Sequence, residues 1–258
     1  LKIISERYTM TTNNTRVALI TGSARRVGAE IARTLHYAGF NIVLHYNHSE
    51  AEANDLCQRL NSQRAHSAVT VQADLAETTQ LQQLMKQVIQ AFGQLDVLVN
   101  NASRFYRTAV ENTSENSWND LLDSNLKSAF FLSQAALPHL KESKGCIINI
   151  TDVHGERPMR DYSVYCIAKA GLIMLTKTLA KELAPDIRVN AVSPGAVMLP
   201  EGENTLSEKD DEKILSRVAL RRHGTAQDVA KAVLYLATNA DYVTGTVLPV
   251  DGGRSLTI

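Results

Sequence analysis

The sequence predicts an α/β fold in which a parallel sheet is covered by helices on both faces. Short apolar runs alternate with longer segments of helical periodicity along the whole chain, which is typical of consecutive strand–helix units. No internal repeat, low-complexity segment or linker interrupts this alternation. The 258 residues, 44% of them hydrophobic, are enough for a single domain with a large core.

Each expected element follows from its local pattern. Strands are expected at residues 16–21 (RVALIT), 41–46, 66–72, 96–100, 146–150, 187–192 and 246–250. Helices are expected at residues 26–37, 50–61, 78–92, 118–140, 162–183, 208–217 and 226–238. Gly39 stands where the first helix needs its C-terminal cap, and Pro185 should end the long helix 162–183.

The domain is expected to span residues 15–258. Residues 1–14 lack the apolar core of a signal peptide and are predicted to be a flexible extension. Residues 196–213 are polar and aperiodic, so we interpret them as a substrate loop; an ordinary surface loop is the alternative.

Composition narrows the class of protein. Lys plus Arg equals Asp plus Glu at 27 each, which does not favour a nucleic-acid partner. Cys57, Cys146 and Cys166 form no CxxC motif, which predicts a reducing, cytoplasmic setting. No apolar run approaches the roughly 20 residues of a membrane span. The seven histidines, His154 and His223 among them, show no ligand spacing, so no metal is expected.

The turn after the first strand has the composition of a phosphate-binding loop. It reads Thr21-Gly22-Ser23-Ala24-Arg25-Arg26-Val27-Gly28 and leads directly into a helix. Glycines let the backbone approach a pyrophosphate, and the helix N-terminus favours its negative charge. A strand-to-helix turn without a ligand is the other interpretation.

The end of the second strand indicates which dinucleotide is bound. NAD sites usually place an acidic residue here, but the sequence runs His45-Tyr46-Asn47-His48-Ser49 before Glu50. Arg25 or Arg26, together with residues 47–49, could receive a 2′-phosphate instead. The pattern therefore favours NADPH over NADH, if a dinucleotide binds at all.

Two further polar positions follow strands. Asp74 comes after the third strand and is interpreted equally well as a helix N-cap or a ligand-binding residue. Asn100-Asn101-Ala102 follows the fourth strand, where asparagine side chains commonly hold loop backbone.

Tyr165 and Lys169 lie four residues apart on the expected helix 162–183 and therefore share a face. A neighbouring ammonium is expected to stabilise the phenolate and lower the tyrosine pKa from its usual value near 10. Such a tyrosine can pass a proton while a nicotinamide passes a hydride. The YxxxK pattern is common by chance, and its place after the fifth strand is what makes it informative.

Together these motifs resemble the short-chain dehydrogenase/reductase family. The matching elements are Thr21-Gly22 with Gly28, Asp74, Asn100-Asn101-Ala102, Asn125, Tyr165 with Lys169, Pro194-Gly195 and Asp251-Gly252-Gly253, in the family order. The resemblance implies a single-domain, Rossmann-type, doubly wound sheet of seven parallel strands. It also implies a nicotinamide cofactor and commonly a homotetramer built on the long helices.

Two departures from the general family pattern resemble one branch, the pteridine reductases. Arg26 replaces the middle glycine of the TGxxxGxG motif, and Asp152 replaces the catalytic serine thirteen residues before Tyr165. Further similar segments are His45-Tyr46 with Ser49, Ala51-Glu52-Ala53-Asn54, Val71-Gln72-Ala73-Asp74, Ser103 with Phe105-Tyr106, and Ser255-Leu256-Thr257. A carboxyl group can accept hydrogen bonds from a pterin or pass a proton to a ring nitrogen. A structural role for Asp152 at the strand end is the alternative.

The resemblance implies these site residues. Asp152, Tyr165, Lys169 and Asn125 would be catalytic, with Asn125 supporting Lys169 through a water. The substrate would contact Arg26, Ser103, Phe105, Asp152 and Tyr165, with Phe105 stacked on the pterin. A core position is the other interpretation of Phe105. The cofactor, NADPH or NADP+, would contact Gly22, Arg25, Arg26, Val27, Gly28, His45, Tyr46, Asn47, His48, Ser49, Asp74, Leu75, Asn101, Ala102, Ser103, Tyr165, Lys169, Pro194 and Gly195.

Three positions differ from the branch and bear on substrate preference. Arg104 stands where the branch has a serine, Val197 lies in a segment that lacks a substrate-contacting serine, and Ile258 stands where the branch has an arginine. The expected activity is NADPH-dependent reduction of a dihydropterin, namely dihydrobiopterin, dihydromonapterin or dihydrofolate. The rivals are a 3-oxoacyl-type carbonyl reductase of the same family and a non-catalytic NADP(H)-binding regulator.

Overall fold

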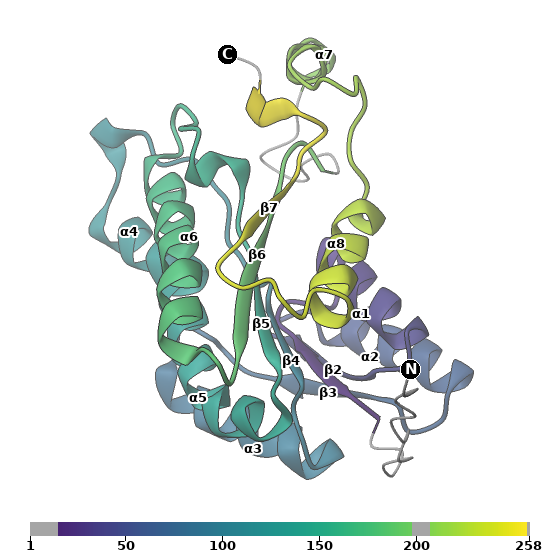
Figure 1. The fold of residues 1–258 in the computed structure, drawn as a ribbon. Coiled ribbons are helices and arrows are strands. Elements are labelled where there is room, and N and C mark those ends of the chain that lie inside the picture. The colour runs from purple at the N-terminus through teal and green to yellow at the C-terminus, as the bar shows by residue number, and fades with distance from the viewer. Residues whose placement is uncertain (1–14, 198–206, 257–258) are drawn as a thin grey trace, which may run out of the picture.

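The computed structural model describes residues 15–197 and 207–256. The expected N-terminal extension 1–14, residues 198–206 of the expected substrate loop, and Ile258 lie outside this part. Seven parallel strands form one sheet in the order β3-β2-β1-β4-β5-β6-β7 (Figure 1). This confirms the predicted single-domain Rossmann-type fold.

The strands lie close to their expected positions. They are β1 Val17–Ile20, β2 Asn41–Tyr46, β3 Ala68–Gln72, β4 Val97–Asn100, β5 Cys146–Ile150, β6 Arg188–Pro194 and β7 Val247–Val250. The third strand begins two residues later than expected because His66 has a φ of 56°, in the left-handed region that a strand cannot include.

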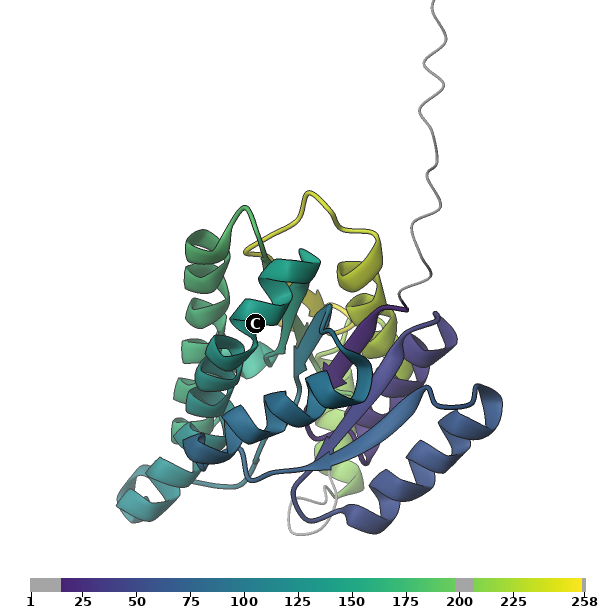
Figure 2. The ribbon, with the colours of Figure 1, turned by 90° about the horizontal axis from the view of Figure 1, so that it is seen from below.

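Six of the described helices form two layers, one on each face of the sheet. The elements are α1 Arg26–Tyr37, α2 Glu50–Gln63, α3 Thr78–Phe92, α4 Glu115–Leu122, α5 Ser128–Ser143, α6 Ser163–Leu183, α7 Glu208–Ser216 and α8 Ala226–Thr238. Apolar side chains of α1, α2 and α8 form one core cluster against the sheet, and those of α3, α5 and α6 form the other. Figure 2 shows the two layers from below. The sheet is therefore buried on both faces, as parallel sheets require.

The segment expected as one helix at 118–140 is interrupted. A π-helical turn, η2 (Asp123–Lys127), separates α4 from α5. The side chain of Asn125 donates to the carbonyl of Leu121, 2.9 Å away, which the backbone N–H of Asn125 would contact in an α-helix. The polar side chain thus substitutes for a helical hydrogen bond, which the apolar periodicity could not reveal.

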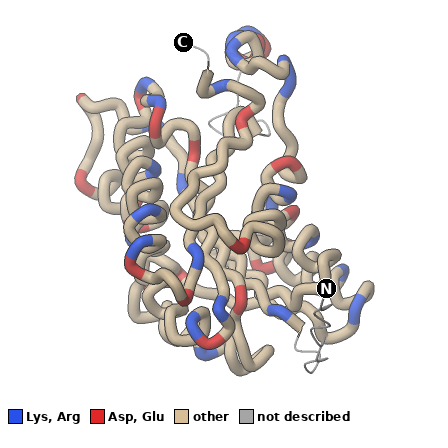
Figure 3. Tube along the Cα trace, in the orientation of Figure 1, with Lys and Arg blue, Asp and Glu red and all other residues tan. Residues whose placement is uncertain are grey.

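Helix α6 meets the length and composition criterion for a membrane span, contrary to the expectation that no apolar run approaches it. Half of that apolar window is buried inside the fold, where the helix packs on the sheet. Core helices meet the same criterion. Figure 3 shows Lys and Arg interspersed with Asp and Glu along the described chain, in keeping with the balanced composition.

A buried polar network joins the sheet to α5 and α6. Asn100 Nδ2 donates to Asn149 Oδ1 at 2.8 Å and to Ser133 Oγ at 3.2 Å. Asn149 Nδ2 donates to Thr176 Oγ1 at 2.9 Å, and this hydroxyl donates to the carbonyl of Leu172 at 2.8 Å. Asn149 and Thr176 are fully buried, so every broken bond leaves a polar atom without water.

Thr176→Val should therefore destabilise the protein by about 1–3 kcal/mol, because it leaves the amide of Asn149 without its acceptor in the core. The free energy of unfolding in urea measures this. Thr176→Ser is the matched control: it keeps the hydroxyl and should cost about 1 kcal/mol for the lost methyl. Equal costs for the two variants would contradict the role given to the hydroxyl.

Candidate active site

A cavity of about 510 Å³ lies at the carboxyl ends of β1 to β4, next to the point where the strand order reverses. Ligands of doubly wound sheets bind at this position. The cavity is lined by the predicted cofactor residues Gly22, Arg25, Arg26, Val27, Gly28, His45, Tyr46, Asn47, His48, Ser49, Asp74, Leu75, Asn101, Ala102 and Ser103. The structure thus brings together residues from four separate strand ends.

The glycine-bearing turn leaves its backbone open toward this cavity. Gly22 has a φ of +60°, and a Cβ there would lie 3.0 Å from the Cα of Ala102. A Cβ on Gly28 would lie 2.4 Å from the carbonyl oxygen of Gly22. Arg25 is the N-cap of α1 and makes no side-chain cap, so the first amides of the helix can meet an anion. These features fit a dinucleotide pyrophosphate.

Arg26 has an unusual backbone conformation, and its side chain lies between two cavities. Its φ is 52°, a conformation that is uncommon and costly for residues other than glycine. Its side chain lines both the 510 Å³ cavity and a smaller neighbouring one. This placement agrees with the predicted contact of Arg26 with both cofactor and substrate.

The turns after β1 and β4 are held together by Thr21 and Asn101. Thr21 Oγ1 accepts the backbone N–H groups of Asn101 and Ala102 at 2.8 and 2.9 Å. Asn101 Nδ2 donates to the carbonyls of Thr21 and Gly22 at 2.8 and 3.1 Å. The asparagine expected to hold loop backbone does so here.

The side chain of His45 connects the glycine-bearing turn to the loop after β3. Its Nδ1 accepts the N–H of Gly22 at 3.1 Å, and its Nε2 lies 3.1 Å from the carbonyl of Ala73, to which it donates. Burial lowers the pKa of His45 to about 4, against smaller opposite effects of Ala73 and Asp74. The ring is therefore neutral at pH 7 and joins three strand ends by hydrogen bonds.

The predicted 2′-phosphate residues lie at the start of α2. Ser49 is its N-cap and makes no side-chain cap hydrogen bond. Arg25 lies 3.7 Å from Glu52 in an exposed ion pair, so its charge is shared with α2. Asp74 is not the N-cap of α3, because Glu77 occupies that position. The Oδ1 of Asp74 instead accepts the backbone N–H of Ala76 at 3.0 Å.

A smaller cavity of about 220 Å³ lies beside the larger one, and Arg26 lines both. Of the predicted residues, Arg26, Phe105, Asp152, Tyr165 and Gly195 line the smaller cavity. Among its other described lining residues, Ala196 and Val197 belong to the segment expected as a substrate loop, and His154, two residues after Asp152, is a residue for which the sequence left a lining role open. Sequence reasoning gave no site role to the rest, which are Met159, Tyr162, Ile214, His223 and Arg254. The larger cavity is also lined by Ser124, which sequence reasoning missed, and by Arg104, which was expected to bear on substrate preference.

Tyr165 and Asp152 are directly hydrogen-bonded. The Tyr165 hydroxyl donates to Asp152 Oδ2 at 2.8 Å, and Asp152 Oδ1 accepts the backbone N–H of His154 at 2.8 Å. The phenol is buried, with an exposed fraction of 4%. The predicted partners, thirteen residues apart in sequence, thus form one proton-sharing pair.

The expected lowering of the Tyr165 pKa is wrong. Burial first, and the carboxylate of Asp152 second, raise the pKa of Tyr165 well above its usual value, while a hydrogen bond with Ser103 acts in the opposite direction. Lys169 Nζ lies 5.6 Å from the centre of the Tyr165 ring rather than against its oxygen. Tyr165 therefore keeps its proton at neutral pH.

Lys169 is buried beneath the site. Its Nζ donates to the carbonyl of Ile150 at 3.0 Å, which fixes the ammonium at the end of β5. Burial lowers the pKa of Lys169 to about 8, and Asp152 acts in the opposite direction. Pro194, also predicted, ends β6 beside Gly195.

Asn125 and Phe105 have contacts beyond those expected. Asn125 Nδ2 donates to the carbonyl of Arg104 at 3.0 Å, and its Oδ1 accepts from the hydroxyl of Ser103. It thus holds the loop beside Tyr165, and no described contact joins it to Lys169.

The Phe105 ring stacks on Tyr162 with centroids 4.6 Å apart, so one face of the Phe105 ring is covered by protein. The alternative interpretation of Phe105 as a core residue is therefore partly correct, because the side chain is half-buried against Tyr162 and Tyr165.

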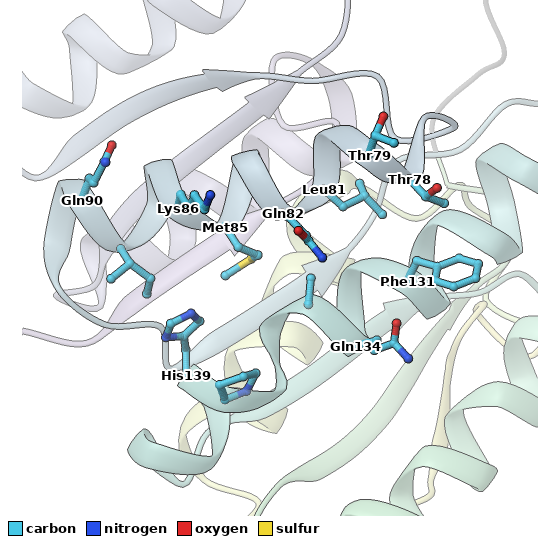
Figure 4. A pocket seen from close by; sticks show the side chains of 13 residues that line it. Thr78, Thr79, Leu81, Gln82, Met85, Lys86, Gln90, Phe131, Gln134 and His139 are labelled. Carbon is cyan, nitrogen blue, oxygen red and sulfur yellow. The ribbon is translucent and has the colours of Figure 1, made fainter.

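A larger hollow, about 1000 Å³, lies between α3 and α5 and does not contain such a site (Figure 4). Its titratable lining groups, among the residues described, are Lys86 and His139. The other lining side chains are apolar or carry amides and hydroxyls. In the described ranges 15–197 and 207–256, no three His, Cys, Asp or Glu side chains gather as metal ligands.

The neutral His45 makes stability depend on pH. Because its folded-state pKa lies below the unfolded value of 6.5, its contribution is present above pH 6.5 and is lost as the pH falls to about 4. The expected loss is about 3 kcal/mol, measured by urea unfolding between pH 7 and 4. His45→Gln should show a shallower slope over this window, although His36, whose pKa burial also lowers, still contributes. Parallel curves would contradict this assignment.

Comparison with known proteins identifies the family. A family model described as enoyl-(acyl carrier protein) reductase matches residues 22–255. The 3-oxoacyl-[acyl-carrier-protein] reductase FabG of Staphylococcus epidermidis is 36% identical over 239 residues, covering 92% of this chain and 97% of that protein. Pteridine reductase 1 of Leishmania tarentolae is 35% identical over an alignment of 290 residues, covering 96% and 99%. A 3-oxoacyl-[acyl-carrier-protein] reductase of Synechocystis is 36% identical, covering 95% and 98%. The chain therefore belongs to the short-chain dehydrogenase/reductase family of oxidoreductases.

Proposed function

We propose that this oxidoreductase is an NADPH-dependent pteridine reductase that converts a 7,8-dihydropterin into its tetrahydro form. The observation that carries the proposal is the carboxylate of Asp152, hydrogen-bonded to Tyr165 at 2.8 Å inside the 220 Å³ cavity. Reduction of a ketone needs a hydroxyl donor beside the carbonyl oxygen, whereas a pterin presents ring nitrogens and an amino group. A carboxylate accepts hydrogen bonds from such groups.

The larger cavity supports the choice of NADPH. Gly22, Gly28 and the open amides of α1 would hold the pyrophosphate, and Asn47, His48 and Ser49 would receive the 2′-phosphate. When bound, NADPH supplies the hydride for the reduction. The absence of an acidic side chain at residues 45–49 favours the phosphorylated cofactor.

The chain's own residues would deliver the proton. Tyr165 stays protonated at neutral pH because burial and Asp152 raise its pKa, so it can act as the acid. Asp152 shares that proton and can orient the pterin through its second oxygen. The net change on a 7,8-dihydropterin is a hydride at C6 and a proton at N5. Dihydrobiopterin, dihydromonapterin and dihydrofolate satisfy this chemistry.

A 3-oxoacyl reductase is the second candidate, because two of the similar proteins carry that name at 36% identity. Asp152 is the feature against it. In both reactions a carbon receives the hydride, but the proton goes to an oxygen in one and to a ring nitrogen in the other. A substitution of Asp152 can therefore separate the two activities.

We also propose a cytoplasmic homotetramer. Phe130 and Phe131 on α5, and Ile167 and Met174 on α6, are large apolar side chains exposed on the long helices. Pairing these faces between subunits would remove this apolar area from water.

Asp152→Ser tests the function directly. It should lower kcat/KM for a dihydropterin by about 10²–10⁴-fold, because it removes the carboxylate that shares the proton of Tyr165. NADPH oxidation is followed with dihydrobiopterin and, in parallel, with a 3-oxoacyl thioester.

Asp152→Asn is the matched control, with the same shape but no carboxylate, and it should lose pterin reduction as well. Undiminished pterin reduction in both variants would refute the role of Asp152. Wild-type reduction of the thioester but of no pterin would establish the second candidate instead.

The rate should also fall at alkaline pH. Lys169 has a pKa of about 8 in the fold. Its side chain is therefore a charged ammonium below pH 8 and a neutral amine above it. We expect kcat/KM to decline about tenfold per unit above pH 8. Tyr165 does not titrate in this range, since its pKa is raised. A profile measured from pH 6 to 10 that stays flat would contradict the catalytic role predicted for Lys169.

A further inference from the structure

Arg254 lies inside the substrate cavity although it is the fifth residue from the end of the chain. It begins the short helix η5 (Arg254–Leu256), directly after the Asp251-Gly252-Gly253 turn. It lines the 220 Å³ cavity together with Asp152 and Tyr165. No role in the reaction described above requires it.

The turn that carries Arg254 is braced on two sides. Asp251 accepts the backbone N–H groups of Gly253 and Ser255 at 2.8 and 2.7 Å. The guanidinium of Arg157, from the loop after β5, donates to the carbonyl of Ser255 at 3.1 Å. These contacts fix the backbone at Arg254 relative to the catalytic strand end.

His154 orients the guanidinium. Its Nδ1 lies 2.9 Å from the carbonyl of Arg157, and because a carbonyl only accepts, Nδ1 carries the proton. In the neutral ring, Nε2 is then an acceptor, and it lies 3.5 Å from the Nη2 of Arg254. His154 follows Asp152 by two residues, so one segment positions both the carboxylate and the arginine.

The cavity is richer in positive than in negative groups. Among its described lining residues, Arg26 and Arg254 carry guanidinium groups, against one carboxylate, Asp152. Burial lowers the pKa of Arg254, and Asp152 acts in the opposite direction, so the guanidinium is partly desolvated. A desolvated cation is stabilised by an anion beside it.

We propose that Arg254 is a specificity-determining residue that binds an anionic group, a carboxylate or a phosphate, on the side chain of the substrate. The proposal rests on the pteridine reductase function and narrows it: pterins with an anionic substituent are preferred over those with only hydroxyl groups. The planar guanidinium suits either anion, because it can donate two parallel hydrogen bonds to two oxygens.

The test uses substrate pairs that differ only in charge. Dihydroneopterin phosphate is compared with dihydroneopterin, and dihydrofolate with its dimethyl ester. The wild-type protein should show a kcat/KM about 10- to 100-fold higher for the charged member of at least one pair, as expected for a hydrogen-bonded charge pair. The pair that shows the preference identifies phosphate or carboxylate as the anion.

Arg254→Gln should abolish this preference, because it removes the guanidinium; kcat/KM should fall by a larger factor for the charged member of the pair than for the neutral one. Arg254→Lys should keep part of it, since the charge remains. Arg222→Gln is the matched control: Arg222 pairs with Asp228 at 3.2 Å, outside the substrate cavity, and its loss should leave the preference unchanged.

Three results would overturn the inference: no preference in the wild type, an Arg254→Gln variant that keeps it, or equal losses for charged and neutral members. The wild-type comparison stands even if a variant fails to fold. Failure of the proposed function is distinct, because then no member of either pair is reduced.

Discussion

Parallel pairing of all seven strands requires that the sheet be covered on both faces, because each strand runs through the core. Both described cavities that contain predicted site residues lie at the edge where the carboxyl ends of the strands meet the loops. Gly22, His45, Asp74, Asn101 and Asp152 all come directly at or after the end of a strand. Residues distant in sequence are thus brought within hydrogen-bonding distance by the sheet alone.

Burial at this edge then sets the charge state of the site. It lowers the pKa of His45 and of Lys169 and raises that of Tyr165, so it favours the neutral form of each group. Asp152 opposes this effect at Lys169 and reinforces it at Tyr165. Burial and Asp152 together therefore leave the lysine charged and the tyrosine protonated at neutral pH.

Much of this could be predicted from the sequence, because the strands are short, apolar and regularly spaced, and the resemblance covers nearly the whole chain. The π turn at Asn125 could not, since it depends on a side chain replacing a backbone hydrogen bond. The direction of the Tyr165 pKa was also missed, because proximity of Lys169 in sequence does not reveal burial. Arg254 and His223 reach the cavity through tertiary contacts that no local pattern encodes; a lone arginine after Asp251-Gly252-Gly253 was the available signal.

Overall identity does not decide between the two candidate substrates, because reductases named for oxoacyl and for pteridine substrates are similar to this chain at 36% and 35%. The side chains that face the small cavity are the ones that can distinguish the two substrates, and Asp152 and Arg254 are among them. A ketone site is lined by hydroxyl groups, whereas Asp152 and Arg254 both carry ionic groups. A polar heterocycle with a charged side chain satisfies both groups, whereas an acyl chain would leave each of them buried against methylenes, which costs free energy.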